Sequence, residues 1–118
     1  MNKLASTAIA LVIGAASFAT SVSAEIIGVY LRNGEEFILV RTTDDGQLYC
    51  TRVGDGFEMC DGITERDDGS WSGESMKHPD MPSFMIFSGK VVFSETEMSL
   101  EGCTAGNALC EAETWPVQ

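Results

Sequence analysis

Turn signals at short, nearly regular intervals constrain this chain more than any other feature. They fall at Asn33-Gly34, Asp44-Asp45-Gly46, Gly54-Asp55-Gly56, Asp67-Asp68-Gly69 and Ser88-Gly89. Glycine next to Asn or Asp supplies the positive φ angles that tight hairpin turns require. No stretch between these turns shows apolar residues at three-four spacing over a helix-length window. We therefore expect an all-β chain whose antiparallel strands follow one another through tight turns.

Eight or nine strands follow from these signals. The expected ranges are 26–32, 36–43, 47–53, 57–63, 70–76, 83–87, 90–94, 97–103 and 110–115. Such a meander closes into a small barrel or folds into a sandwich. The expected hairpin over 83–94 is apolar on both faces. We interpret it as a barrel wall covered by a loop or as an exposed patch for self-association or partner binding.

The first 24 residues predict a signal peptide. Lys3 provides a positive start, 8–19 is an apolar run, and Val22-Ser23-Ala24 places small residues before the expected cleavage site. The apolar run is shorter than the ~20 residues of a spanning helix, so we expect no membrane anchor after cleavage. Residues 25–118 are then one domain, exported to the periplasm or secreted.

The exported part is strongly acidic. The whole chain has net charge −11, and removal of Lys3 leaves six basic residues against 18 acidic ones, a net charge of −12. Nucleic acid binding needs a basic face, so we expect no nucleic acid partner. The charge suits a cationic protein instead.

Four cysteines in an exported chain favour two disulfides. A three-residue loop at 54–56 pairs Val53 with Phe57 and Arg52 with Glu58, which places Cys50 opposite Cys60. A turn at Gly106-Asn107 likewise places Cys103 opposite Cys110. We prefer a four-residue loop there because it puts the two cysteines at the closer, non-hydrogen-bonded kind of pair. The spacing does not suit a zinc site.

No catalytic or metal-binding constellation is visible, and we expect no cofactor and no metal. His78, the single histidine, stands in His78-Pro79-Asp80, which we interpret as a solvated loop. The acidic turns at 44–46 and 67–69 lack the spacing of a calcium loop and are explained by Asp-Gly turn chemistry.

The second half of the chain resembles a family of small exported bacterial proteins, domain of unknown function 2147. Residues 68–74 with His78-Pro79 resemble its W-x-G-G…D-P segment, and 100–103 with Cys110 and Thr114-Trp115 resemble its closing segment. Gly28-Val29-Tyr30 stands where the family begins with G-x-W. The resemblance implies a lipocalin-like, up-and-down antiparallel barrel and a periplasmic or secreted location, and it implies no reaction.

Two functions remain open at this point. A barrel of this size holds one small apolar ligand, for which Trp71, Tyr30 and His78 are the candidate binding residues. For Trp71 and Tyr30 the alternative is an ordinary core position. The second function is an acidic interaction domain that binds or inhibits a cationic protein. Either is a binding role without catalysis.

Overall fold

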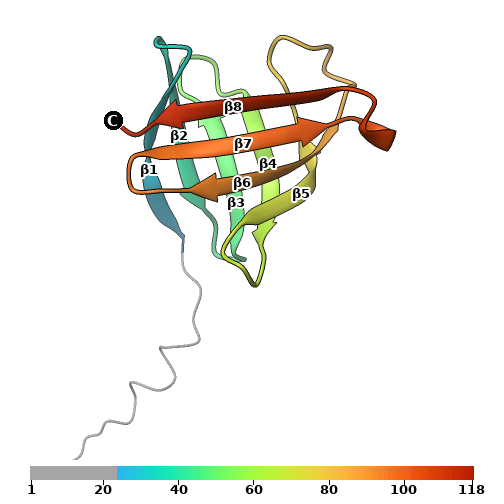
Figure 1. The fold of residues 1–118 in the computed structure, drawn as a ribbon. Helices are drawn as coiled ribbons and strands as arrows, with labels where there is room; N and C mark the ends of the chain where they lie inside the picture. Colours follow the sequence, from blue (N-terminus) through green and yellow to red (C-terminus); the bar gives the residue numbers. More distant parts are fainter. Residues whose placement is uncertain (1–23) are drawn as a thin grey trace, which may run out of the picture.

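The computed structural model describes residues 24–118, and these form an eight-stranded antiparallel sheet curled into a nearly closed barrel (Figure 1). The strands are β1 (Glu25–Arg32), β2 (Glu36–Thr42), β3 (Gln47–Arg52), β4 (Glu58–Glu65), β5 (Trp71–Met76), β6 (Phe87–Phe93), β7 (Glu97–Cys103) and β8 (Cys110–Pro116). Each strand pairs with the next one along the chain. The all-β barrel is thus confirmed, while the predicted signal peptide, residues 1–24, lies outside the described residues except for Ala24. Within 24–118 there is no helix of the length and apolarity needed to span a membrane.

The barrel closes where its first strand meets the end of its last one. Tyr30 forms an antiparallel bridge with Val117, and the backbone N–H of Gln118 donates to the carbonyl of Val29 at 2.9 Å. In Figure 1, β8 ends beside β1 on the left of the view. This seam consists of one isolated bridge and one further backbone hydrogen bond, so β1 and β8 meet at one point and do not form a ladder.

Apolar side chains that alternate along the strands fill the inside of the barrel. Met98 on β7 is fully buried, and Trp115 opposite it is 1 % exposed. The buried apolar residues are Tyr30, Ile38, Val40, Leu48, Cys50, Met59, Cys60, Ile63, Trp71, Met76, Phe87, Val91, Met98 and Trp115. They form one contiguous core, as the two-residue period of strands requires.

The first disulfide, Cys50–Cys60, is confirmed, and its two residues are directly opposed. The register that we predicted around it is wrong. Gly56 N–H donates to the carbonyl of Arg52 and Arg52 N–H to that of Phe57, so the loop has four residues, 53–56. A β-bulge at Met59 restores the register by one residue before the cysteines meet.

The second disulfide, Cys103–Cys110, is confirmed together with its wider loop. Thr104 N–H donates to the carbonyl of Leu109 at 2.8 Å, which leaves the four residues 105–108 between them. A short 3-10 turn, η2 (Ala105–Asn107), occupies most of this loop. Gly106 and Asn107 both have positive φ angles, which explains why glycine and asparagine stand there.

The expected hairpin over residues 83–94 is wrong. Ser88-Gly89 is not a turn but lies inside β6, and 77–86 is a loop that joins β5 to β6. Gly89 pairs with Gly73 on one side and Gly102 on the other, so three glycines form a row across β5, β6 and β7. Methyl groups added at Gly73 and Gly102 would lie 2.6 Å from Ile63 Cγ2 and 3.1 Å from Phe87 Cβ. The row lets the wall bend directly onto the core side chains.

Candidate functional site

Polar side chains gather at the end of the barrel where four connections meet. We call this the loop end; its connections are 33–35, 53–57, 77–86 and 104–109. In Figure 1 the β1–β2, β3–β4 and β5–β6 connections stand at the top of the view. An up-and-down barrel brings alternate connections to one end, so residues far apart in the sequence become neighbours here.

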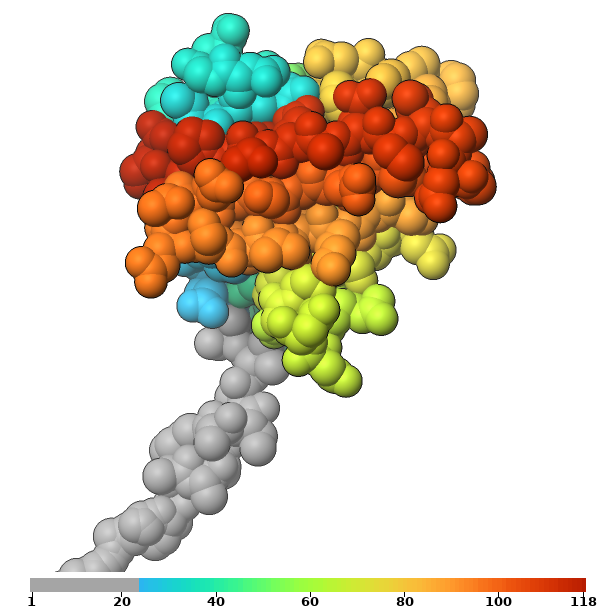
Figure 2. Space-filling model, viewed as in Figure 1, coloured from blue at the N-terminus to red at the C-terminus, as the bar shows by residue number. Residues whose placement is uncertain are grey.

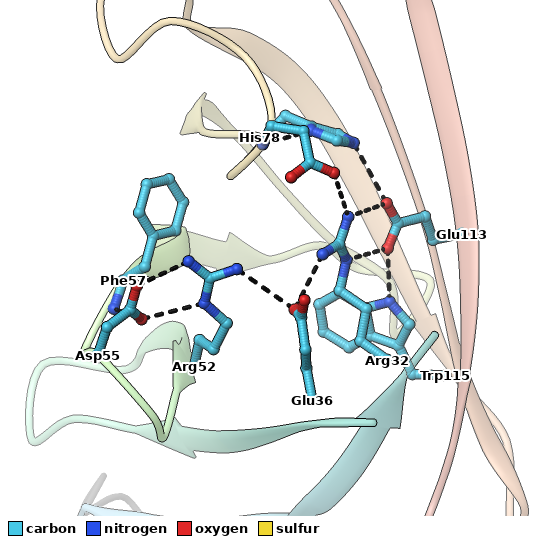
Figure 3. A network of polar contacts seen from close by, with 9 residues as sticks. Arg32, Glu36, Arg52, Asp55, Phe57, His78, Glu113 and Trp115 are labelled. Carbon is cyan, nitrogen blue, oxygen red and sulfur yellow. Dashed lines mark hydrogen bonds and ion pairs between the residues drawn. The ribbon is translucent and has the colours of Figure 1, made fainter. Parts of the chain in front are cut away.

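Arg32, the last residue of β1, is the centre of this polar cluster (Figure 3). Its side chain is 2 % exposed. Nε and Nη2 donate to the two carboxylate oxygens of Glu113 at 2.7 and 3.0 Å, and Nη1 donates to Glu36 at 2.9 Å. The indole N–H of Trp115 donates to the same Glu113 at 2.8 Å. A buried guanidinium is stable only with partners of this quality.

The cluster extends to the β3–β4 hairpin through Arg52. Its guanidinium reaches Glu36 at 3.4 Å and donates twice to Asp55, at 3.0 and 2.7 Å. It also lies over the ring of Phe57, 5.5 Å from the ring centroid. Figure 3 shows Glu36 between the two arginines, so the two hairpins share one ionic network.

His78 belongs to this cluster, and our interpretation of it as a solvated loop residue is wrong. Its side chain is only 15 % exposed, and Nε2 lies 3.3 Å from Glu113 Oε2. Nδ1 accepts a hydrogen bond from the backbone N–H of Asp80 at 3.1 Å. Asp80 itself approaches Arg32 Nη2 at 3.6 Å. The β5–β6 loop is therefore fastened to the loop end of the barrel through two of its residues.

Charge within the network shifts several ionisation equilibria. Burial by itself raises the pKa of Glu113, but the hydrogen bonds from Arg32 and Trp115 outweigh it and hold the pKa below its ordinary value. The hydrogen bond to Glu113 raises the pKa of Arg32, against the opposing effect of burial. Hydrogen bonds from Arg52 and from the Phe57 backbone lower the pKa of Asp55 to about 2. The ionised forms of Glu113 and Asp55 are thus favoured within the network.

The geometry of the network supports anchoring more than catalysis. Both ring nitrogens of His78 already have partners, Glu113 and the backbone of Asp80. A general base must instead present a nitrogen to the substrate, and a nucleophile must lie within its reach. Across residues 24–118, no group of three or more His, Cys, Asp or Glu side chains is arranged to hold a metal ion.

The three residues that we predicted to bind a ligand do not form one pocket. Trp71 and Tyr30 are core residues, 9 % and 4 % exposed, and burial raises the pKa of Tyr30. His78 lies in the polar cluster instead. A cavity of about 30 Å³ lies beside it, lined by residues that include Met76, Phe87 and Glu113. That volume is close to one water's share of the liquid, whereas pockets for small molecules are roughly ten times larger or more.

Ligand-sized hollows lie instead on the outer wall. Two adjoining depressions of about 480 and 470 Å³ share Arg66, Ser72 and Lys90. Arg66 donates to Ser72 Oγ at 2.9 Å. Carboxylates such as Asp67 and Glu101 also line these hollows, so their surface is polar and of mixed charge. These two hollows do not suit the apolar ligand that we considered from the sequence. Two other surface hollows, of about 550 and 430 Å³, are more apolar and are lined in part by Ile26 and by Phe37 and Val53.

Sequence reasoning missed the two central residues, Arg32 and Glu113. One signal was available: strict alternation along the first strand puts Arg32 on the same face as the buried Tyr30. A buried arginine demands a carboxylate, but nothing local indicates that the partner is Glu113.

The comparison with known proteins adds no assignment: no family model, no curated protein and no solved structure matches this chain. The resemblance to domain of unknown function 2147 accordingly stays a prediction.

Proposed function

We propose that this protein is a non-catalytic, exported domain that binds a cationic protein. The observation that carries the proposal is a barrel filled by its own side chains and surrounded by carboxylates. Residues 25–118 hold 18 acidic and six basic side chains. Because the interior is filled, we assign binding to the surface of the barrel.

The interior offers little to a ligand. Ile38, Val40, Leu48, Ile63, Val91 and Met98 are all at 0 % exposure. The cavity that reaches core residues Met76 and Phe87 holds only about 30 Å³. An apolar ligand would need side chains to leave a closely packed core, at a cost of several kcal/mol per large residue. Surface binding requires no such rearrangement.

The surface carries mainly negative charge. Three of the six basic residues, Arg32, Arg41 and Arg52, are bonded to carboxylates of this same domain. The exposed carboxylates are Glu25, Glu35, Asp44, Asp45, Asp55, Asp61, Glu65, Asp67, Asp68, Glu74, Asp80, Glu95, Glu97 and Glu101. Such a field accelerates encounter with a basic partner and repels acidic ones.

The location that we propose for this protein, outside the cytoplasm, fits this role. Two disulfides within 24–118 are consistent with an oxidising compartment. We place the protein in the periplasm or outside the cell, where the predicted signal peptide would deliver it. Two disulfides and a filled core suit a domain that must stay folded there while its surface does the binding.

Binding to basic probe proteins tests the proposal. We expect the domain to bind immobilised cytochrome c and lysozyme at about 0.01 M salt and to lose that binding at about 1 M salt, where the Debye length falls from ~30 to ~3 Å. An acidic protein of similar size is the control and should not bind at either salt concentration. Absence of binding to both basic probes, or binding that ignores salt, would overturn the proposal.

A further inference from the structure

The β5–β6 loop presents apolar side chains to solvent at the loop end. Phe84 is 81 % exposed and Ile86 is 52 % exposed. Met81 and Met85 of the same loop pack against the core. In Figure 2 this loop, in yellow-orange, stands beyond β8 on the side where the β1–β2 hairpin also projects. The loop therefore covers the barrel with one set of side chains and offers another set outward.

Several contacts hold the loop in this conformation. Asp80 lies 3.6 Å from Arg32, and His78 lies 3.3 Å from Glu113. Within the loop, Met81 N–H donates to the carbonyl of His78 and Met85 N–H to that of Pro82. Two prolines, at 79 and 82, restrict the backbone further. A loop ordered before binding loses less entropy when it meets a partner.

Carboxylates accompany the apolar side chains at this end. Asp80, on the same loop, has a 70 % exposed side chain, and Asp55, on the β3–β4 hairpin, has a 52 % exposed one. Glu35 is exposed on the β1–β2 turn. The arginines of this end, Arg32 and Arg52, are already bonded to carboxylates. Asp80 and Asp55 are themselves paired with these arginines, and Lys77 adds a third basic side chain. The carboxylates at this end still outnumber the basic side chains by five to three, namely Glu35, Glu36, Asp55, Asp80 and Glu113. The surface thus combines an apolar projection with an excess of negative charge.

We propose that residues 80–86 are the docking loop for the cationic partner, and this inference rests on the function proposed above. Phe84 and Ile86 enter an apolar recess of the partner, and Asp80 meets lysine or arginine side chains at its rim. Aromatic side chains that become buried at the centre of an interface dominate binding energies. A second copy of this chain is a poorer occupant because its own carboxylates would face these ones.

A random peptide display library tests the inference. Peptides are selected on the full domain, and their affinities are then compared for wild type, Phe84→Ser, Ile86→Ser and the control Val92→Ser. Val92 lies on β6, and its 48 % exposure nearly matches that of Ile86. All three positions are exposed, so thermal unfolding should show that each variant keeps its fold. We expect peptides with basic residues beside an apolar one, weakened roughly tenfold or more by Phe84→Ser and unchanged by Val92→Ser.

The outcomes separate this inference from the proposed function. Basic peptides that bind Phe84→Ser as tightly as wild type overturn the docking loop but leave the proposed function standing. A selection without basic peptides overturns both. A dimer seen by sedimentation that Phe84→Ser dissolves shows that a second copy occupies the surface and also overturns the inference. Asp80→Asn provides a second variant, expected to reduce the salt dependence of peptide binding while retaining the apolar contact.

Discussion

Arg32 and Glu113 stand 81 positions apart in the chain, yet two nitrogens of the arginine donate to both carboxylate oxygens of the glutamate. The pair joins the end of β1 to β8 and lies beside the seam at which the barrel closes. Breaking a buried pair costs far more than breaking an exposed one, because the remaining charge has no water around it. This contact is therefore the most sensitive electrostatic point of the domain.

Replacing Arg32 by methionine should destabilise the domain by about 3 to 5 kcal/mol, because it leaves Glu113 without its principal partner. Urea unfolding followed by fluorescence measures the change. Arg41→Met is the matched control: its partner is Glu58, and the two side chains are 33 % and 29 % exposed. The control should cost no more than about 1 kcal/mol. Equal losses in the two variants would contradict the special role of Arg32.

The same pair predicts how stability depends on pH. The pKa of Glu113 is lower in the folded protein than its ordinary value, so the unfolded chain binds a proton at a higher pH than the folded one. The stabilisation by Glu113 is complete above its unfolded pKa, near 4.3, and is lost as pH falls through the folded pKa. Glu113→Gln should flatten the acid side of the stability profile, measured by urea unfolding from about pH 6 to 3. Glu74→Gln, at an exposed position of β5, controls for the removal of one charge.

Gly89→Ala should destabilise the barrel because there is no room for the methyl group that it adds. That group would collide with the Met76 side chain and lie 2.8 Å from the backbone carbonyl of Glu101. We expect a loss of about 1 to 3 kcal/mol, as for other overpacked cores. Gly54→Ala is the control, since nothing lies within 4 Å of the added carbon there. Differential scanning calorimetry of both variants measures the change in stability. A Gly89→Ala variant as stable as wild type would refute the close packing of the glycine row.

The two disulfides should differ in how fast a thiol reduces them. Cys50 and Cys60 are both at 0 % exposure, whereas Cys110 is exposed and Cys103 half-buried. A thiolate has to reach a sulfur atom, so access controls the rate. With dithiothreitol under native conditions, we expect Cys103 and Cys110 to be alkylated first, as read by peptide mapping. Simultaneous loss of both bridges would show that reduction proceeds through global unfolding instead.

Trp71→Ala should behave as a core truncation. The residue is 9 % exposed and belongs to the contiguous apolar core, so its removal should cost ~3 to 5 kcal/mol in thermal or urea unfolding. Peptide binding by the fraction that stays folded should be unchanged, because the proposed docking loop is elsewhere. A small loss of stability would reopen the earlier hypothesis that Trp71 lines a ligand pocket.

The sequence alone determined the features that depend on near neighbours. Glycine, asparagine and aspartate specify the hairpin turns by their backbone preferences, and these turns in turn bring Cys50 to Cys60 and Cys103 to Cys110. Even the error of one residue in the predicted β3–β4 loop left the first disulfide intact, because the bulge at Met59 compensates for it. Strand alternation is local in the same way: along Glu97–Cys103 the buried Met98 and Gly102 are an even number of residues apart and share one face.

Only the tertiary structure decided the features that depend on distant strands. Ser88-Gly89 has the composition of a turn, but Gly89 is needed to let β6 approach Met76 between Gly73 and Gly102. His78 looked solvated because nothing near it in sequence indicates Glu113 as its neighbour. Arg32 could be placed on an inward face, yet its partner comes from the last strand. Which side chains become buried, and which charged groups become partners, depends on the strands that meet when the barrel closes. The local sequence pattern does not indicate which strands these are.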